Sequence, residues 1–211
     1  MIELSGIRKT LGGRRVLDGV DLRVAAGECV VLTGDSGAGK STLLRIVAGL
    51  EAAEDGHVKL RGVDVATMAP HERRLGVQFQ ESALWPHLTL EENVAFSGKA
   101  AKGRALQCLE RAGLRELAGR RPGDVSGGEA RRAALARALA AQCDILLLDE
   151  PLTQLQPAAR LEMAAWIREE QRAAGAACLW VAHDAEEAAL LTPRIYVLAG
   201  GRLTERESVE R

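Results

Sequence analysis

The chain has 211 residues, of which 47% are hydrophobic and 27% charged, a composition typical of one globular unit with a substantial core. Its formal net charge is −1 at pH 7 and aromatic residues make up only 3%, so neither a basic groove nor stacking platforms for nucleic acid are expected. The cysteines stand singly, which argues against a zinc site and a disulfide framework. No signal peptide or long apolar run is present, so we expect a soluble, intracellular chain.

Strand and helix patterns alternate along most of the chain. The first thirty residues and residues 57–65 alternate apolar and polar side chains, as antiparallel strands with one solvated face do. Continuous apolar segments, which predict buried strands, lie at 29–32, 76–79, 145–148, 178–181 and 195–198. Helical patterns between them cover 40–50, 128–141 and 158–173. This order predicts an α/β fold with an N-terminal antiparallel β-subdomain and a mainly parallel sheet covered on both faces.

Residues 82–125 interrupt the alternation. They contain helical patterns at 90–96 and 102–112 but no strong strand, and we interpret them as a helical insertion subdomain. The whole chain, 1–211, is then a single domain whose catalytic core is formed by 1–81 and 126–211. The sequence Gly-Gly-Arg at 12–14 and 200–202 predicts two turns. Because the chain ends soon after the second turn, no additional C-terminal regulatory domain is expected.

The stretch GDSGAGKST matches the pattern GxxxxGK[ST] between a predicted strand and a predicted helix, which is the context expected for a phosphate-binding loop. Glycines let backbone amides turn toward a phosphate, Lys40 balances the charge of the β- and γ-phosphates, and the hydroxyl of Ser41 suits Mg²⁺. The candidate nucleotide-binding residues of this loop are Gly34, Asp35, Ser36, Gly37, Ala38, Gly39, Lys40, Ser41 and Thr42.

Polar residues follow three other predicted strands. Asp149 and Glu150 end the strand ILLLDE, and their side chains point to opposite faces, so they serve different roles. Asp149 suits a water-mediated Mg²⁺ contact, and Glu150 suits polarisation of an attacking water. His183 and Gln80 also follow strands, and the carboxyl ends of parallel strands meet at one edge of the sheet. We predict His183 and Gln80 as further catalytic residues, with Gln80 also contacting the metal.

The stretch VSGGE, with Ser126, Gly127 and Gly128 at a predicted helix start, is a second candidate cradle for a phosphate. It contains no lysine and binds nucleotide poorly by itself. It makes sense as the cover of a nucleotide held by another copy of the chain. Two copies under a two-fold axis would then bury two ATP molecules between GDSGAGKST of one and VSGGE of the other.

These motifs, in this order, resemble those of the ATP-binding cassette (ABC) ATPases over essentially the whole chain. GDSGAGKST is similar to the Walker A loop, Gln80 to the Q-loop, VSGGE to the signature, ILLLDE to Walker B and His183 to the switch histidine. The resemblance implies a P-loop NTPase core, ATP and Mg²⁺ as ligands, and contact of Ser126, Gly127 and Gly128 with the γ-phosphate in trans. Leu11 and Val16 are further candidates for nucleotide contact.

The same resemblance implies a pair of cassettes that drives transport through a separate membrane permease. The helical insertion, with the segment after Gln80, is then expected to dock on that permease. The stretch FQESALWPHLTLEENVAF is similar to importer-type cassettes of bacteria. The expected location is therefore cytoplasmic, on the inner face of the cell membrane through the permease.

Two positions depart from the family pattern. Leu11 stands about where the family has an aromatic residue that stacks on adenine, so we expect weaker discrimination between ATP and GTP. Gln156 stands where the family sequence SALD has its aspartate, which helps link the two sites of a dimer. Either hydrolysis is slower or less coupled than in an SALD cassette, or Gln156 simply caps the helix that starts at Pro157.

The leading interpretation is the ATPase subunit of a bacterial ABC importer. Alternatives are an exporter subunit, an ABC ATPase of DNA repair or translation, and a small-molecule P-loop kinase. Repair and translation proteins typically carry coiled-coil insertions, zinc cysteines or tandem cassettes, and a kinase has no reason to keep VSGGE. The transported solute and the choice between a homodimer and a mixed pair stay open.

Overall fold

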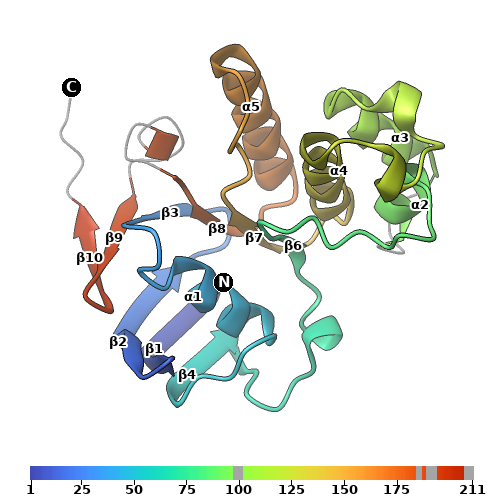
Figure 1. Ribbon diagram of the computed structural model, residues 1–211. Helices are drawn as coiled ribbons and strands as arrows, with labels where there is room; N and C mark the ends of the chain where they lie inside the picture. The colour runs from blue at the N-terminus through green and yellow to red at the C-terminus, as the bar shows by residue number, and fades with distance from the viewer. Residues whose placement is uncertain (97–101, 184–186, 189–193, 207–211) are drawn as a thin grey trace.

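A computed structural model describes residues 1–96, 102–183, 187–188 and 194–206 of the chain (Figure 1). One sheet has four antiparallel strands in the order β2-β1-β4-β5, and the other has six strands in the order β10-β9-β3-β8-β7-β6. The first sheet contains β1 (Ile2–Leu11), β2 (Arg14–Val24), β4 (Asp55–Leu60) and β5 (Val63–Asp64). The second contains β3 (Cys29–Thr33), β6 (Gly76–Gln78), β7 (Ile145–Asp149), β8 (Ala177–Val181), β9 (Ile195–Ala199) and β10 (Arg202–Arg206).

The predicted fold class is confirmed. In the six-stranded sheet, β3 pairs in parallel with β8 and β9, and β7 pairs in parallel with β6 and β8. One strand end and one additional strand differ from the sequence prediction. β6 ends at Gln78, so Gln80 lies two residues beyond the strand instead of at its end. A further strand, β10, follows the turn at Gly200 and Gly201 and pairs antiparallel with β9.

Neighbouring residues of the parallel strands alternate between two hydrophobic cores, one on each face of the sheet. Leu146 and Trp180 belong to the core on the side of the long helices, whereas Leu147 and Leu179 belong to the core shared with the antiparallel sheet and α1 (Lys40–Ala48). The side chains of a strand point alternately to its two faces, and both faces are covered here. This explains why the sequence shows continuous apolar segments instead of alternation.

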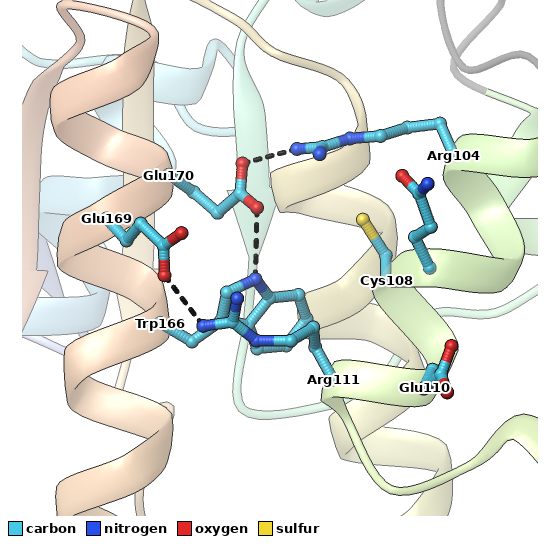
Figure 2. A pocket seen from close by; sticks show the side chains of 8 residues that line it. Arg104, Cys108, Glu110, Arg111, Trp166, Glu169 and Glu170 are labelled. Atoms are coloured by element: carbon cyan, nitrogen blue, oxygen red, sulfur yellow. Dashed lines mark hydrogen bonds and ion pairs between the residues drawn. The ribbon is translucent and has the colours of Figure 1, made fainter.

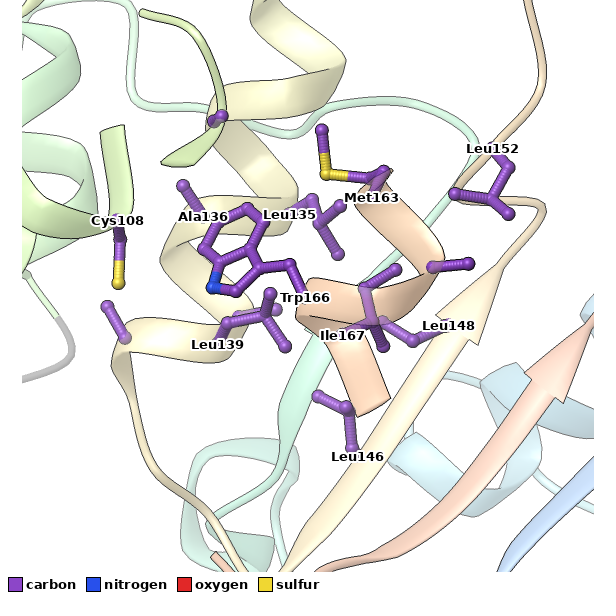
Figure 3. Close-up of a cluster of buried hydrophobic side chains, with 14 of the residues drawn as sticks. Cys108, Leu135, Ala136, Leu139, Leu146, Leu148, Leu152, Met163, Trp166 and Ile167 are labelled. Atoms are coloured by element: carbon purple, nitrogen blue, oxygen red, sulfur yellow. The ribbon is translucent and has the colours of Figure 1, made fainter. Parts of the chain in front are cut away.

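Trp166 is the centre of the core on the side of the long helices. It lies on α5 (Pro157–Ala173), is only 1% exposed, and packs near Leu135 and Leu139 of α4 (Gly127–Ala140) (Figure 3). An indole buried to this extent contributes several kcal/mol, and this packing fixes α4 and α5 against the sheet.

The helical insertion lies at one end of this core. It contains α2 (Leu90–Ala95), α3 (Lys102–Arg111), and three-residue 3-10 turns at Arg115–Leu117 and Pro122–Asp124; a four-residue 3-10 turn at Pro70–Arg73 precedes β6. Residues of α2 and α3 share the core of α4, so α4 packs against both the insertion and the sheet. In the described part of the chain, no helix is both long and apolar enough to cross a membrane.

An ion pair joins the two sheets. Arg61, in the turn between β4 and β5, donates from Nε to Oδ2 of Asp144 over 2.6 Å, and its Nη2 donates to the other carboxylate oxygen. The same guanidinium donates to the backbone carbonyls of Arg73 and Arg74. Asp144 directly precedes β7, so this fork positions the antiparallel sheet relative to the strand that carries Asp149.

We predict that Arg61→Ala lowers the free energy of unfolding by about 1 kcal/mol at pH 7, because a two-point ion pair is lost from a partly exposed site. The hydrogen bond from Arg61 lowers the pKa of Asp144 in the folded chain. The pair therefore stabilises the fold above the ordinary aspartate pKa of about 4, and this contribution is lost as the pH falls through the lowered pKa. Urea unfolding at several pH values measures the effect.

Arg120 is exposed and belongs to the helical insertion. Arg120→Ala is therefore the matched control, because it also replaces an arginine by alanine. This control should change the free energy of unfolding little at any pH. The Arg61 variant should lose less free energy of unfolding as the pH falls. If this loss stayed constant between about pH 5 and pH 2, Arg61 would contribute packing and not the ion pair.

Candidate active site

The carboxyl ends of β3, β8 and β7 are in register. Leu32 of β3 pairs with Val181 of β8, and Val181 pairs in turn with Asp149 of β7. These three residues form one row across the sheet, and the segments that leave it begin at the same edge. The phosphate loop follows β3, Glu150 follows β7, and His183 follows β8 two residues after Val181.

The phosphate loop is closely packed against its neighbours at two glycines. A Cβ atom at Gly34 would lie 2.3 Å from the carbonyl oxygen of Leu198, and one at Gly39 would lie 2.8 Å from the carbonyl oxygen of Val16. Both glycines also have positive φ, 139° and 106°. Only glycine combines this backbone conformation with this close approach, so the fold itself requires both residues.

Lys40 begins α1 and is only 8% exposed. Its Nζ donates to the carbonyl oxygens of Gly34 over 2.5 Å and Asp35 over 3.0 Å. The lysine is therefore held inside the curve of the loop by the loop's own carbonyls. An ammonium group in this position lies where it would contact an anion bound by the loop.

Asp149 and Ser41 meet beside the loop. Asp149 is 3% exposed, and burial raises the pKa of its carboxyl group. A hydrogen bond with the side chain of Ser41 acts in the opposite direction, as does the charge of Lys40. A buried carboxylate next to a hydroxyl is a donor set that suits a hard divalent cation, whose charge would offset the cost of burial. The residues present therefore fit Mg²⁺.

Glu150 stands in a left-handed backbone conformation with φ of 50°, which is uncommon for a residue other than glycine, asparagine or aspartate. Its amide donates to the carbonyl of Val181 over 3.0 Å. Its carboxylate accepts a hydrogen bond of 3.4 Å from Oγ1 of Thr153. Thr153 is not among the residues predicted from the sequence; a hydroxyl three residues after an acid in a turn is the signal that points to it.

Two other predicted catalytic residues lie at the same edge but are exposed. Gln80 follows the outermost parallel strand, β6, whose Gln78 pairs with Leu148 one residue before Asp149. His183 follows β8. The structure thus places both beyond the carboxyl ends of strands next to β7, as the sequence predicted, with Gln80 farther from its strand than expected.

Ser126, Gly127 and Gly128 lie elsewhere, at the start of α4. Ser126 is the N-cap residue: its Oγ accepts from the amide of Glu129 over 3.3 Å and donates to Oε2 of Glu129 over 2.7 Å. The Ser126 backbone amide also donates to Oε2 over 2.7 Å, and these two bonds, from the amide and the hydroxyl, hold the pKa of the Glu129 carboxyl group below its usual value. The amides of Gly127 and Gly128 are in the first turn, where a helix supplies no acceptor of its own.

Nothing in the described part of the chain requires glycine at these two positions. Apart from its own helix backbone, a Cβ atom at Gly127 would meet no described atom within 4 Å, and one at Gly128 would meet only Nη1 of Arg132 at 3.9 Å. Neither residue has a positive φ. This contrasts with Gly34 and Gly39, and it means that the described part of the chain supplies no steric need for glycine at the start of α4.

Three predicted positions remain, Leu11, Val16 and Gln156. Leu11 ends β1 and is 40% exposed, whereas the side chain of Val16 is 9% exposed and packs in the core with α1. Gln156 occupies the N-cap position of α5, but its side chain makes no capping hydrogen bond. Gln156 is thus the N-cap residue of the helix that starts at Pro157, as one of the two alternatives predicted, and it fills this position without a side-chain hydrogen bond.

A cavity of about 280 Å³ lies away from this edge, between α3 and α5 (Figure 2). Its charged residues neutralise one another: Arg104 pairs with Glu170, and Arg111 pairs with Glu169 over 2.8 Å. Arg111 also lies 5.8 Å from the centre of the Trp166 ring. These contacts tie the helical insertion to α5, and their paired charges leave little to attract an ionic ligand.

Comparison with known proteins gives a consistent result. The family model described as ABC transporter matches residues 17–153. The sulfate/thiosulfate import ATP-binding protein CysA of Salmonella typhi is 38% identical, over 100% of this chain and 61% of its own length. CysA of Methylococcus capsulatus is 40% identical, over 99% of this chain and 63% of its own length. The chain thus spans about three fifths of the length of these curated relatives.

Solved structures match along the full chain. The dimeric structure of MJ0796, a bacterial ABC transporter cassette, has a TM-score of 0.89 and 31% identity, with 100% of both chains covered. A dimeric post-hydrolysis state of the same cassette, bound to ADP and Pi, has a TM-score of 0.89 and 30% identity over the same coverage.

We predict opposite effects of the same substitution at Gly34 and Gly127. Gly34→Ala should lower the free energy of unfolding by about 3 kcal/mol or more, because the new Cβ clashes with a backbone carbonyl in a left-handed region. Gly127→Ala should leave the fold equally stable or more stable by up to about 1 kcal/mol, because alanine favours a helix. Thermal and urea unfolding compare the two. Equal destabilisation by both would mean that the start of α4 is sterically constrained by its own chain.

Proposed function

Because this chain belongs to the ABC transporter family, we propose that it is the ATP-binding and ATP-hydrolysing subunit of a bacterial importer. The observation that supports this most strongly is the division of the site. Lys40, Asp149, Glu150 and His183 lie at or just beyond one edge of the sheet, whereas the Ser126 turn lies at the start of another helix. One half has the groups to hold and cleave a nucleotide, and the other supplies only amides and a helix dipole.

The proposed ligands are ATP and Mg²⁺. Residues Gly34 to Thr42 would surround the β- and γ-phosphates with backbone amides, and Lys40 would turn from the loop carbonyls to the phosphate oxygens. Ser41 and Asp149 would hold the metal, with Gln80 completing the site from the segment after β6. When bound, the metal neutralises charge that develops between the β- and γ-phosphates.

Glu150 is the proposed general base. Its position immediately after Asp149 sets it beside the metal-binding residue, and Thr153 orients its carboxylate. It would align a water with the γ-phosphate and accept the proton of that water as the new bond forms. His183, from the end of β8, would hold the γ-phosphate and the water in line.

Ser126, Gly127 and Gly128 would act on the nucleotide of a second copy. The two glycines have room for a Cβ within the described part of their own chain, so close approach by a phosphate and a facing phosphate loop explains them better than the local fold does. A two-fold arrangement forms two such sites at once. ATP would then hold the copies together, and its hydrolysis would release them.

The proposed transmembrane partner is a separate permease. The helical insertion and the segment after Gln80 would contact it, which places the chain on the cytoplasmic face of the membrane. We propose uptake instead of export because the relatives are named as import proteins, and the oxyanions sulfate and thiosulfate are the solutes that their names suggest.

Glu150→Gln should trap the ATP-bound dimer, because an amide cannot accept the proton of the attacking water and hydrolysis slows by ~10²–10⁴-fold. Size-exclusion chromatography at millimolar Mg-ATP should show a dimer for this variant and a monomer without nucleotide. Adding Gly127→Ala to it should weaken the dimer at least about tenfold while the fold stays intact. A Glu150→Gln chain that stays monomeric with bound ATP would contradict the proposal.

Gln156→Asp should raise the rate of phosphate release severalfold in the presence of the co-purified permease. The physical reason is that an aspartate before Pro157 supplies a charge for contact between the two sites, and the Gln156 side chain makes no helix-capping bond that the change would remove. Gln156→Asn, which shortens the side chain without adding charge, is the matched control. An aspartate variant no faster than the asparagine variant would show that the charge is not what limits turnover.

A further inference from the structure

Two of the four cysteines are direct neighbours in the parallel sheet. Cys29 of β3 and Cys178 of β8 are paired residues in the register of these strands, and their thiols form a hydrogen bond with each other. Cys178 belongs to the core that contains Trp166, and Cys29 packs against the same core, so both side chains lie on one face of the sheet. Adjacent strands are about 4.8 Å apart, which lies within the range of Cα separations that a disulfide spans.

The two thiols differ in access and in acidity. Cys178 is completely buried, and its pKa is raised by its hydrogen bond with Cys29 and by burial. Cys29 is the first residue of its strand and is partly exposed. The hydrogen bond from Cys178 lowers the pKa of Cys29, against the opposing effect of burial. A small oxidant therefore meets the partly exposed thiol first, with a second thiol behind it.

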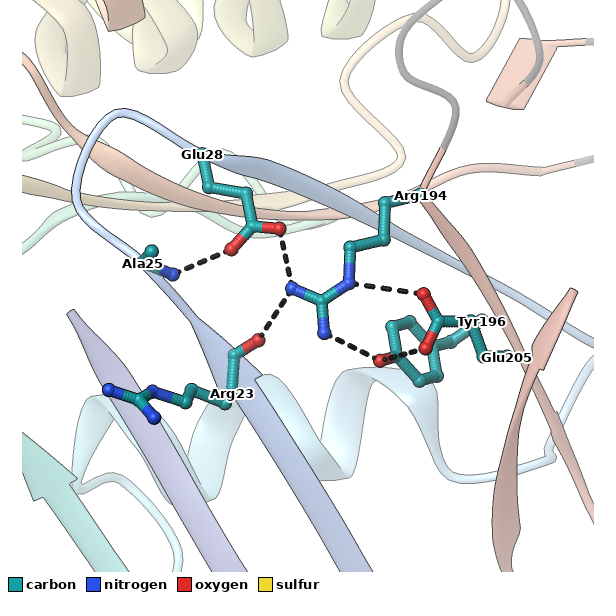
Figure 4. A network of polar contacts seen from close by, with 6 residues as sticks. All are labelled: Arg23, Ala25, Glu28, Arg194, Tyr196 and Glu205. Carbon is teal, nitrogen blue, oxygen red and sulfur yellow. Dashed lines mark hydrogen bonds and ion pairs between the residues drawn. The ribbon is translucent and has the colours of Figure 1, made fainter. Parts of the chain in front are cut away.

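The start of β3 is held firmly beside β8. The carbonyl of Glu28 accepts from the amide of Cys178 over 2.8 Å. The carboxylate of Glu28 accepts from Arg194 over 2.5 Å, and Arg194 also donates to the Tyr196 hydroxyl and to Glu205 (Figure 4). The Cys178–Glu28 bond and the strand pairing hold the two thiols adjacent, and the Arg194 network ties the start of β3 to β9 and β10 as well.

We propose that Cys29 and Cys178 are a redox-active thiol pair that closes into a reversible intrachain disulfide when the protein encounters hydrogen peroxide. The Cys29 thiolate attacks one peroxide oxygen, the O–O bond breaks, and Cys29 becomes a sulfenic acid while hydroxide leaves and takes a proton. The Cys178 sulfur then attacks the Cys29 sulfur, and the sulfenic oxygen leaves as water with the Cys178 proton. Two thiols and one peroxide thus give one disulfide and two waters.

The other cysteines have different surroundings. Cys108 is buried in α3 with its pKa raised by burial, and Cys143 is partly exposed in the segment before β7. Neither is a register partner of Cys29. Disulfides in reducing compartments are usually transient and redox-sensing.

The test uses the purified full chain in Cys143→Ser form, so that only Cys29, Cys108 and Cys178 remain. Hydrogen peroxide should lower the thiols titratable in denaturant from three to one, and non-reducing peptide mapping should give a crosslinked peptide containing Cys29 and Cys178. Dithiothreitol should restore all three. A Cys178→Ala variant on the same background should instead accumulate sulfenic acid at Cys29, measured as at least about fivefold more dimedone adduct than in its parent.

Two results would overturn the proposal. One is that Cys29 and Cys178 both stay titratable after peroxide in the folded chain. The other is that Cys29 reacts with dimedone equally in the presence and absence of Cys178, which would mean that the buried thiol does not resolve the sulfenic acid. The peptide map of the chain with both cysteines intact keeps the test decisive even if Cys178→Ala fails to fold.

Discussion

The parallel register of β3, β8 and β7 is the constraint on which the proposed site depends. It sets Leu32, Val181 and Asp149 in one row, and the phosphate loop, Glu150 and His183 leave the sheet from that row or just beyond it. Because each strand is buried on both faces, a slip of one residue would exchange its two sets of side chains between two different cores. The register is therefore fixed by packing, and the positions of Asp149 and Glu150 follow from it.

The alternation of the strands also decides which side each acid faces. Ile145 and Leu147 point into the core shared with α1, and Asp149 continues this series toward Ser41 at the start of that helix. Glu150 directly follows the strand in a left-handed conformation and is only partly buried. Two adjacent acids thus occupy different environments, one buried beside a hydroxyl and one held by Thr153. The proposed division between metal binding and proton acceptance rests on this difference.

Much of this arrangement could be predicted from the sequence, because its signals are local. Continuous apolar segments gave the strands, and GDSGAGKST gave a loop whose glycines the fold requires at Gly34 and Gly39. What could not be predicted depends on contacts between distant residues. The end of β6 at Gln78, the additional strand β10 and the packing of α4 against both insertion and sheet all arise from tertiary pairing. The Cys29–Cys178 neighbourhood is of the same kind: two single cysteines 149 positions apart become partners only through the register of β3 and β8.

The central claim is that a complete site requires Lys40 from one copy and the Ser126–Gly128 turn from another. The most direct measurement mixes two variants, Lys40→Ala and Gly127→Arg, each defective in a different half of the site. In a mixed dimer, one of the two sites combines an intact phosphate loop with an intact turn. The account predicts that each variant alone releases almost no phosphate, and that an equimolar mixture recovers up to about a quarter of the activity of the unaltered chain. A mixture no more active than its two components would contradict it.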